Sequence, residues 1–263
     1  TVFAACDGGS SGSDSFVPPA TNLRLAAVDL WGAGELRVAG VAESDDGRDG
    51  NGDGDALDVL AIVLDLTDGS RHDLGLALDD LRMPVAGDVL AALFVAEQAQ
   101  GATDLNGDGD ANDAVLHVFD ARTDLTTNSG LAGVLPAVGA GLVAFGADEL
   151  EQGQDFDGDG QANSFVFHVY DSRTGLSTNL TRRLNSAIVF EEHEFMFTTD
   201  EVGPGDLNGD GDADDSGIFQ LFDLTLGGIV TLPVEIHDPP HGHEEEWYAL
   251  VDESGQGADL NGD

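Results

Sequence analysis

An acidic loop with a regular spacing of oxygen-bearing side chains recurs along the chain. In the copy DLNGDGDAND, Asp104, Asn106 and Asp108 place side-chain oxygens at loop positions 1, 3 and 5, and Gly109 at position 6 permits a turn with positive φ. Such a turn lets side chains that would alternate in a strand converge on one point. Calcium takes six to eight oxygen ligands in irregular geometry. The loop therefore predicts a calcium site.

Five copies of this loop define a repeat. They begin at residues 49, 104, 155, 206 and 259, so the period is 51 to 55 residues, and the sequence stops inside the fifth copy. We call them acidic loops 1 (49–58), 2 (104–113), 3 (155–164), 4 (206–215) and 5 (from 259). The residues predicted to contribute metal ligands are Asp49, Asn51, Asp53, Asp55 and Asp58; Asp104, Asn106, Asp108, Asp110 and Asp113; Asp155, Asp157, Asp159 and Gln161; Asp206, Asn208, Asp210, Asp212 and Asp215; and Asp259, Asn261 and Asp263.

The first half of each loop resembles the calcium loop of EF-hands, D-x-[DN]-x-[DN]-G. That resemblance implies a backbone carbonyl as the ligand at position 7, which explains why Gln161 is acceptable there. The second half departs from it, because position 12 holds no glutamate and an acid stands instead at position 10 in loops 1, 2 and 4. Loop 3 has Ser164 at position 10. The calcium-bearing loops of integrin-type propellers are the closer likeness.

A second set of repeated acids precedes the loops by five to seven residues. We call them the strand-end glutamates, because each follows an apolar run that predicts a β-strand. Each is predicted to be a ligand of its own loop or to contact one, and the alternative is a solvated charge at the end of a strand. They are Glu43, Glu97, Glu149, Glu201 and Glu253.

The acidity of the loops has two alternative interpretations. The loops of a halophilic protein can be acidic and solvated without holding a metal at a fixed site. Magnesium could replace calcium, but it is a poorer fit, because it prefers fewer protein ligands and tighter octahedral geometry. Loop 3 is the weakest predicted site, since it lacks acids at positions 7 and 10.

Further repeated polar residues favour structural roles. Acids that follow the third predicted strand of each repeat are expected to form Asx turns, and two histidines at matching strand positions are expected to pack or to lie on the surface. The segment EIHDPPHGHEEEW is expected to be a polar loop, with a transition-metal site as the alternative. These residues are Asp65, Asp120, Asp171 and Asp223; His117 and His168; and His237, His241 and His243.

Composition limits the classes of partner. The net charge is −42 and all nine basic residues are arginine, which excludes nucleic acid as a partner and disfavours an anionic membrane surface. The 41% of apolar residues is sufficient for a folded core. Motifs of a nucleophile elbow, a phosphate loop or a zinc protease are absent from the sequence, so a binding or scaffold module is favoured over an enzyme.

The N-terminal segment resembles the end of a bacterial lipoprotein signal peptide. The only cysteine, Cys6, follows small residues in TVFAAC and precedes DGGSSGSDS. This resemblance implies lipidation of Cys6, a signal remnant over 1–6 and a flexible linker over 7–21. A free or buried cysteine is the alternative. An N-terminal lipid anchor would be the only predicted contact with a membrane.

The periodic pattern predicts an all-β fold with little helix. Each period holds about four short runs rich in branched and aromatic residues and bounded by Gly, Asp, Asn or Pro, which indicates β-strands. Four strands in about 50 residues make one blade of a β-propeller, with another β-repeat array as the alternative. Each acidic loop would then join the second and third strands. The predicted blades are 22–81, 82–133, 134–184, 185–236 and, in part, 237–263.

One repeat, GDVLAALFVAE followed by AVLHVFDARTDLTTNSGLA, resembles a blade of TolB-type propellers, and the likeness extends over about 35–263. Similar DLNGDGD repeats occur in secreted bacterial proteins. The resemblance implies a propeller fold and calcium loops but no activity. The chain is therefore predicted to be an extracytoplasmic calcium-binding module, secreted or anchored to the cell envelope, with a protein or carbohydrate ligand. A secreted carbohydrate-active hydrolase or lyase whose active site lies elsewhere, or an adhesive surface protein, is the alternative.

Overall fold

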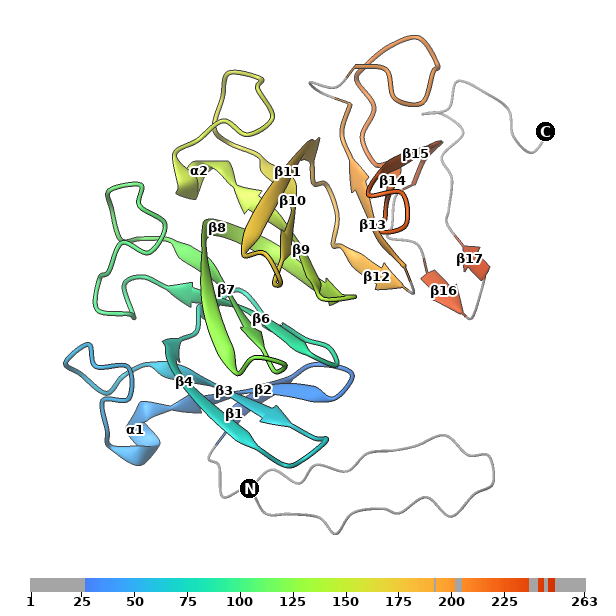
Figure 1. The fold of residues 1–263 in the computed structure, drawn as a ribbon. Helices are drawn as coiled ribbons and strands as arrows, with labels where there is room; N and C mark the ends of the chain where they lie inside the picture. The colour runs from blue at the N-terminus through green and yellow to red at the C-terminus, as the bar shows by residue number, and fades with distance from the viewer. Residues whose placement is uncertain (1–26, 192, 202–204, 237–240, 244–245, 249–263) are drawn as a thin grey trace, which may run out of the picture.

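The computed structural model describes residues 27–191, 193–201, 205–236, 241–243 and 246–248 (Figure 1). The predictions for Cys6, for 1–21, for Glu253 and for acidic loop 5 lie outside these residues. The elements are β1 (Ala27–Trp31), β2 (Leu36–Ala42), α1 (Glu43–Asp46), β3 (Val59–Asp65), β4 (Arg71–Ala77), β5 (Val85–Ala86), β6 (Leu90–Ala96), β7 (Ala114–Asp120), β8 (Leu125–Gly139), β9 (Leu142–Asp148), α2 (Glu149–Gln152), β10 (Phe165–Asp171), β11 (Leu176–Arg183), β12 (Val189–Glu191), β13 (Glu194–Thr199), β14 (Ile218–Asp223), β15 (Gly228–Glu235), β16 (His241–His243) and β17 (Glu246–Tyr248).

The described strands form antiparallel sheets in which neighbours in sequence are neighbours in space. Blade 1 is β1–β4, blade 2 is β5–β7 with the first part of β8, blade 3 is the rest of β8 with β9–β11, and blade 4 is β12–β15. The hairpin of β16 and β17 follows blade 4. The predicted all-β fold with four-stranded propeller blades is confirmed, and the two helices are single turns of four residues each.

Strand β8 links blades 2 and 3 without a break. Its residues up to Ala132 pair with β7, and those from Gly133 onwards pair with β9. One 15-residue strand therefore serves as the outer strand of blade 2 and the inner strand of blade 3, and this is why their strands form one seven-stranded sheet.

The four blades share an irregularity of register. Where the third strand pairs with the fourth, the register shifts one residue before Ile62, His117, His168 or Gln220. A β-bulge at a fixed place bends the outer strand and increases its twist. The repeat therefore extends from the sequence to the pairing of individual residues.

Three apolar clusters lie between successive blades and hold them together. Each draws buried side chains from two blades, such as Val63 with Leu93, Leu116 with Phe145, and Phe167 with Phe197. The Phe167 and Phe197 rings stack with centroids 4.0 Å apart. Because one blade cannot bury both faces of its own sheet, this packing between neighbours is the main source of the core.

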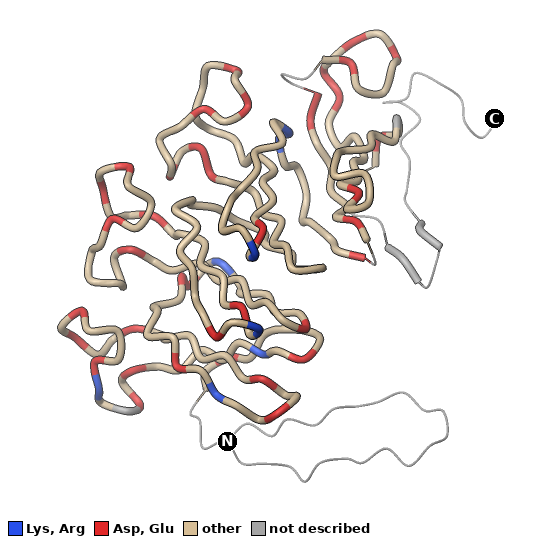
Figure 2. Tube along the Cα trace, in the orientation of Figure 1, with Lys and Arg blue, Asp and Glu red and all other residues tan. Residues whose placement is uncertain are grey.

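The acidic loops leave the blades at one end, where the second strand passes to the third (Figure 1). Figure 2 shows Asp and Glu concentrated along these loops. Within the described residues, no helix is both long enough and apolar enough to cross a bilayer.

Candidate metal sites

The first aspartate of each acidic loop fixes the turn that follows it. In loop 2, Asp104 accepts the N–H of Gly107 on one carboxylate oxygen at 2.6 Å and that of Gly109 on the other at 3.2 Å. Gly109 has a φ of 107°, as the sequence predicts for position 6. Asp49, Asp155 and Asp206 make the equivalent pairs of bonds. Hydrogen bonds to the first aspartate of the loop thus stabilise the turn.

The strand-end glutamates of the described blades are buried and reach into their loops. Their exposed fractions are 3% for Glu43 and 0% for Glu97, Glu149 and Glu201. Solvation at a strand end is therefore the wrong description of these four. Each accepts a backbone N–H from the start of its loop, at 2.5 or 2.6 Å. The loop consequently folds back onto the end of the second strand.

Carboxylate oxygens converge at each described loop. Three acids per loop have oxygens that all lie within 4.8 Å of one another. In loops 1, 2 and 4 the group is the strand-end glutamate with the aspartates at positions 7 and 10; in loop 3 it is Glu149 with positions 1 and 3. The groups are Glu43, Asp55 and Asp58; Glu97, Asp110 and Asp113; Glu149, Asp155 and Asp157; and Glu201, Asp212 and Asp215.

These groups differ from the EF-hand likeness in one respect. At position 7 the carboxylates of Asp55, Asp110 and Asp212 join the group, whereas the likeness assigns a backbone carbonyl there. The aspartates at positions 1 and 5 of loops 1, 2 and 4 lie outside the groups. Their oxygens mainly accept backbone N–H groups that shape the loop, such as Asp108 from Asp110 at 3.0 Å.

Burial, and to a smaller extent nearby like charges, raises the pKa of an aspartate in loop 2. Burial, together with the charges of Asp108, Glu97 and Glu151, raises the pKa of Asp113 to about 7, although a hydrogen bond from Asn106 lowers it. Burial likewise raises the pKa of Asp58. Two unit charges about 4 Å apart repel by roughly 1 kcal/mol in water and by roughly 4 kcal/mol at an effective dielectric constant of 20. A bound cation would remove this repulsion.

Loop 4 carries a buried oxygen whose hydrogen-bonding capacity is unused. Glu201 accepts N–H groups from Leu207 and Asn208 on Oε1, while its Oε2 is buried and has no hydrogen-bond partner among the described residues. An unpaired buried carboxylate oxygen is costly. Glu201 belongs to the group with Asp212 and Asp215. A hard cation that takes oxygen ligands fits this arrangement.

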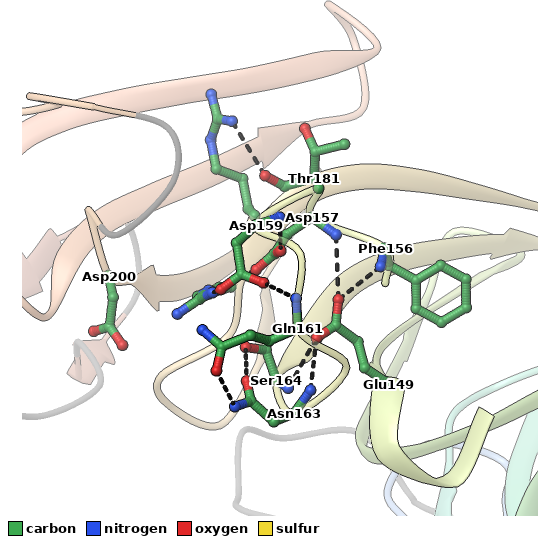
Figure 3. A network of polar contacts seen from close by, with 12 residues as sticks. Glu149, Phe156, Asp157, Asp159, Gln161, Asn163, Ser164, Thr181 and Asp200 are labelled. Carbon is green, nitrogen blue, oxygen red and sulfur yellow. Dashed lines mark hydrogen bonds and ion pairs between the residues drawn. The ribbon is translucent and has the colours of Figure 1, made fainter. Parts of the chain in front are cut away.

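Loop 3 differs because a basic side chain enters it. Arg183 of β11 donates from Nε to Asp157 Oδ2 at 2.5 Å, and its Nη2 contacts Asp159 Oδ2. Figure 3 shows this loop, with Glu149 receiving the N–H groups of Phe156, Asp157, Asn163 and Ser164. The predicted ligand Gln161 lies in the same loop, where its backbone N–H donates to Asp159 Oδ1 at 2.7 Å.

The asparagines at position 3 link neighbouring blades. Asn51 donates to the carbonyl of Ala99 at 2.7 Å, and Asn106 donates to that of Glu151 at 3.2 Å. The same amides donate to the position 10 carboxylates of their own loops. The sequence predicts these asparagines as ligands but gives no sign of the bond to the next blade, which only the stacking of the blades brings within reach.

The other repeated polar residues have structural roles. The predicted Asx turns are confirmed, since Asp65, Asp120, Asp171 and Asp223 each accept the N–H of the residue two positions later at 2.6 to 3.0 Å. His117 and His168 are buried and belong to none of the carboxylate groups of the described residues. Part of the segment predicted as a polar loop is extended, since His241–His243 form strand β16, which pairs with β17. Its possible metal ligands lie outside the described side chains.

Comparison with known proteins yields matches only among solved structures. No family model matches the sequence, and no curated protein matches it. TolB from Acinetobacter baumannii aligns with a TM-score of 0.40 at 10% identity, over 82% of this chain and 45% of that one. An oligogalacturonate lyase in complex with manganese aligns with a TM-score of 0.40 at 11% identity, over 79% and 53%. The chain thus spans about half the length of these two structures.

The β-propeller domain of the Trilobed protease from Pyrococcus furiosus aligns with a TM-score of 0.43 at 9% identity, over 86% of this chain and 72% of that one. At such identities the likeness concerns the course of the chain alone. The order of the sheets and their register establish the propeller blades in this protein.

Proposed function

We propose that this protein is an extracytoplasmic β-propeller module for binding or scaffolding, and that calcium ions held in its acidic loops stabilise it. The observation that carries the proposal is the convergence of three carboxylates at each described loop. One of these carboxylates, that of Glu201, has a buried oxygen with no hydrogen-bond partner among the described residues. Oxygen-only donors of this charge fit calcium better than a softer metal.

The proposed role of calcium is to lock the second and third strands of a blade together. In loop 2, Glu97 directly follows β6, whereas Asp110 and Asp113 lie within the four residues before β7. An ion shared by these carboxylates would tie the two strand ends and offset their repulsion. A site filled at 100 times its dissociation constant adds about 2.7 kcal/mol to the free energy of unfolding.

The concentration at which such sites fill supports an extracytoplasmic location. Calcium modules outside cells commonly have dissociation constants of about 10⁻⁴ to 10⁻³ M, so they fill in external media and not in cytosol. The resemblance of TVFAAC to a lipoprotein signal supports the same location. Proteins or carbohydrates are the proposed ligands of the module, because its charge excludes nucleic acid.

Thermal unfolding tests the proposal. The full chain is melted with EGTA, with millimolar calcium and with millimolar magnesium, in high sodium chloride throughout. A large rise in melting temperature that is specific to calcium is expected, and Asp110→Ala should reduce it. Asp80→Ala, which removes an exposed acid from the link between blades 1 and 2, is the matched control. Equal protection by magnesium or by sodium alone would favour solvated acidic loops and refute the proposal.

A further inference from the structure

We infer that Arg183 is a built-in cation of acidic loop 3, and that this loop holds no calcium ion while the guanidinium is in place. The inference rests on the proposed calcium role of the other loops. It assigns one of the repeated loops a different chemistry, in which a side chain replaces the metal.

The contacts of Arg183 are those of a bound cation. Its Nε donates to Asp157 Oδ2 at 2.5 Å and its Nη2 contacts Asp159 Oδ2, so the guanidinium spans positions 3 and 5. The three side chains are largely buried, with exposed fractions of 16% for Arg183, 4% for Asp157 and 12% for Asp159. Charge-assisted hydrogen bonds of this kind are about twice as strong as neutral ones.

The residues around Arg183 also reduce the need for a metal. Loops 1, 2 and 4 have aspartate at positions 7 and 10, whereas loop 3 has Gln161 and Ser164. The two oxygens of Glu149 accept four backbone N–H groups at 2.6 to 3.2 Å. In loop 4, by contrast, one oxygen of Glu201 has no hydrogen-bond partner among the described residues.

The strand register shows what stands at the same place in the other blades. Val166 pairs with Arg183 across the outer strands of blade 3, and the equivalent partners in blades 1, 2 and 4 are Ala77, Ala132 and Glu235. The backbone N–H groups of the two alanines donate to the side-chain oxygens of Gln100 and Gln152, which belong to the following blade. Among the four described blades, therefore, only blade 3 carries a basic side chain at this position of the outer strand.

The inference implies that the acidic loops of the described blades differ in their dependence on calcium. Loops 1, 2 and 4 would become ordered when calcium binds. Loop 3 would keep its conformation when calcium is removed, because its cation is the guanidinium of Arg183, which is part of the chain. Blade 3 packs against both blade 2 and blade 4. Blade 3 would thus remain ordered without calcium, between two blades whose loops depend on calcium.

A matched pair of substitutions within the carboxylate groups of loops 2 and 3 tests the inference by ion counting. Equilibrium dialysis of the full chain against calcium, followed by elemental analysis, gives the number of bound ions. Asp110→Asn in loop 2 should remove one ion, and Asp157→Asn in loop 3 should remove none. Loss of one ion in both variants overturns the inference and leaves the proposed function standing. Absence of bound calcium in the unsubstituted protein refutes the proposed function.

Removal of the internal cation gives an independent readout. Arg183→Ala, which copies the residue of blades 1 and 2, should bind one more calcium ion at millimolar concentration. In EGTA its melting temperature should fall by several degrees relative to the unsubstituted protein, and calcium should recover the loss. Arg173→Ala, at an arginine with 63% of its side chain exposed, is the control that should change neither. An Arg183→Ala protein that gains no ion and is not rescued by calcium contradicts the inference.

Discussion

The buried carboxylate of Glu97 accepts the backbone N–H of Leu105 at 2.5 Å, on the oxygen opposite the one that accepts the N–H of Asp113 at 3.1 Å. A single side chain at the end of β6 therefore holds both ends of acidic loop 2. The backbone N–H of Glu97 in turn donates to the carbonyl of Asp113 at 2.9 Å. This makes the loop an ordered ring closed on a buried negative charge.

Glu97→Gln should weaken calcium binding at loop 2 while leaving one oxygen to accept the N–H of Leu105. Loss of one charge close to the ion is expected to lower the affinity by about 5- to 1,000-fold, because charge pairs at this range contribute roughly 1 to 4 kcal/mol. Calorimetric titration with calcium measures the change. Glu191→Gln, at an exposed position of β12, should leave all affinities unchanged. Equal affinities for the two variants would contradict a ligand role for Glu97.

Asn106→Asp should separate the ligand role of position 3 from the link to the next blade. The substitution keeps a side-chain oxygen but removes the donor to the Glu151 carbonyl, and it adds a charge beside Asp113. We expect a loss of about 1 to 3 kcal/mol in the free energy of unfolding in EGTA, and a smaller loss at saturating calcium. Urea unfolding under both conditions measures it.

Asn112→Asp is the matched control for this charge. It adds a carboxylate to the same loop at an exposed position whose amide bonds to Asp110 rather than to the next blade. If both variants lose the same free energy in EGTA, the effect of Asn106→Asp comes from charge repulsion, and the link between blades contributes nothing measurable.

The strands and the acidic loops could be predicted from the sequence because both follow one period. Runs such as VLHVF and the spacing of Asp104, Asn106 and Asp108 are local patterns that need no knowledge of neighbours. The contact of Glu97 with its loop could be predicted only as one of two alternatives, because the burial of this side chain depends on how far the loop folds back.

Arg183 shows where local patterns fail. It lies 24 residues after Asp159 in the sequence, and only the bulged register between β10 and β11 brings it to the loop. The link from Asn106 to blade 3 and the continuous strand β8 likewise depend on how blades stack. Each of these contacts joins separate strands or blades. The repeat in the sequence is a local pattern, so it does not predict them.

Phe167→Ala should destabilise the protein whether or not calcium is present. The ring is fully buried between blades 3 and 4 and stacks on Phe197, so its removal is expected to cost about 3 to 5 kcal/mol. Urea unfolding in EGTA and in calcium should give similar losses, because the cavity lies in the apolar core away from the loops. A loss confined to EGTA would mean that calcium, rather than packing, holds blades 3 and 4 together.

His168 should make the protein less stable as the pH falls from about 6.5 to about 4. Burial lowers the pKa of this imidazole to about 4 from its ordinary value of 6.5, and its Nε2 is buried with no hydrogen-bond partner among the described residues. The folded state therefore favours the neutral ring, and the unfolded state binds more protons in this window. Stability is complete above pH 6.5 and declines towards pH 4, by about 3 kcal/mol in total.

His168→Ile, which copies Ile62 of blade 1, should remove this part of the acid slope. Free energies of unfolding are measured between pH 4 and pH 7 in EGTA, so that calcium binding does not contribute to the slope. His193→Gln, at an exposed position, is the control and should keep the slope of the unsubstituted protein. An unchanged slope in His168→Ile would show that the buried imidazole is not what couples folding to protons, and would assign the acid sensitivity to other groups.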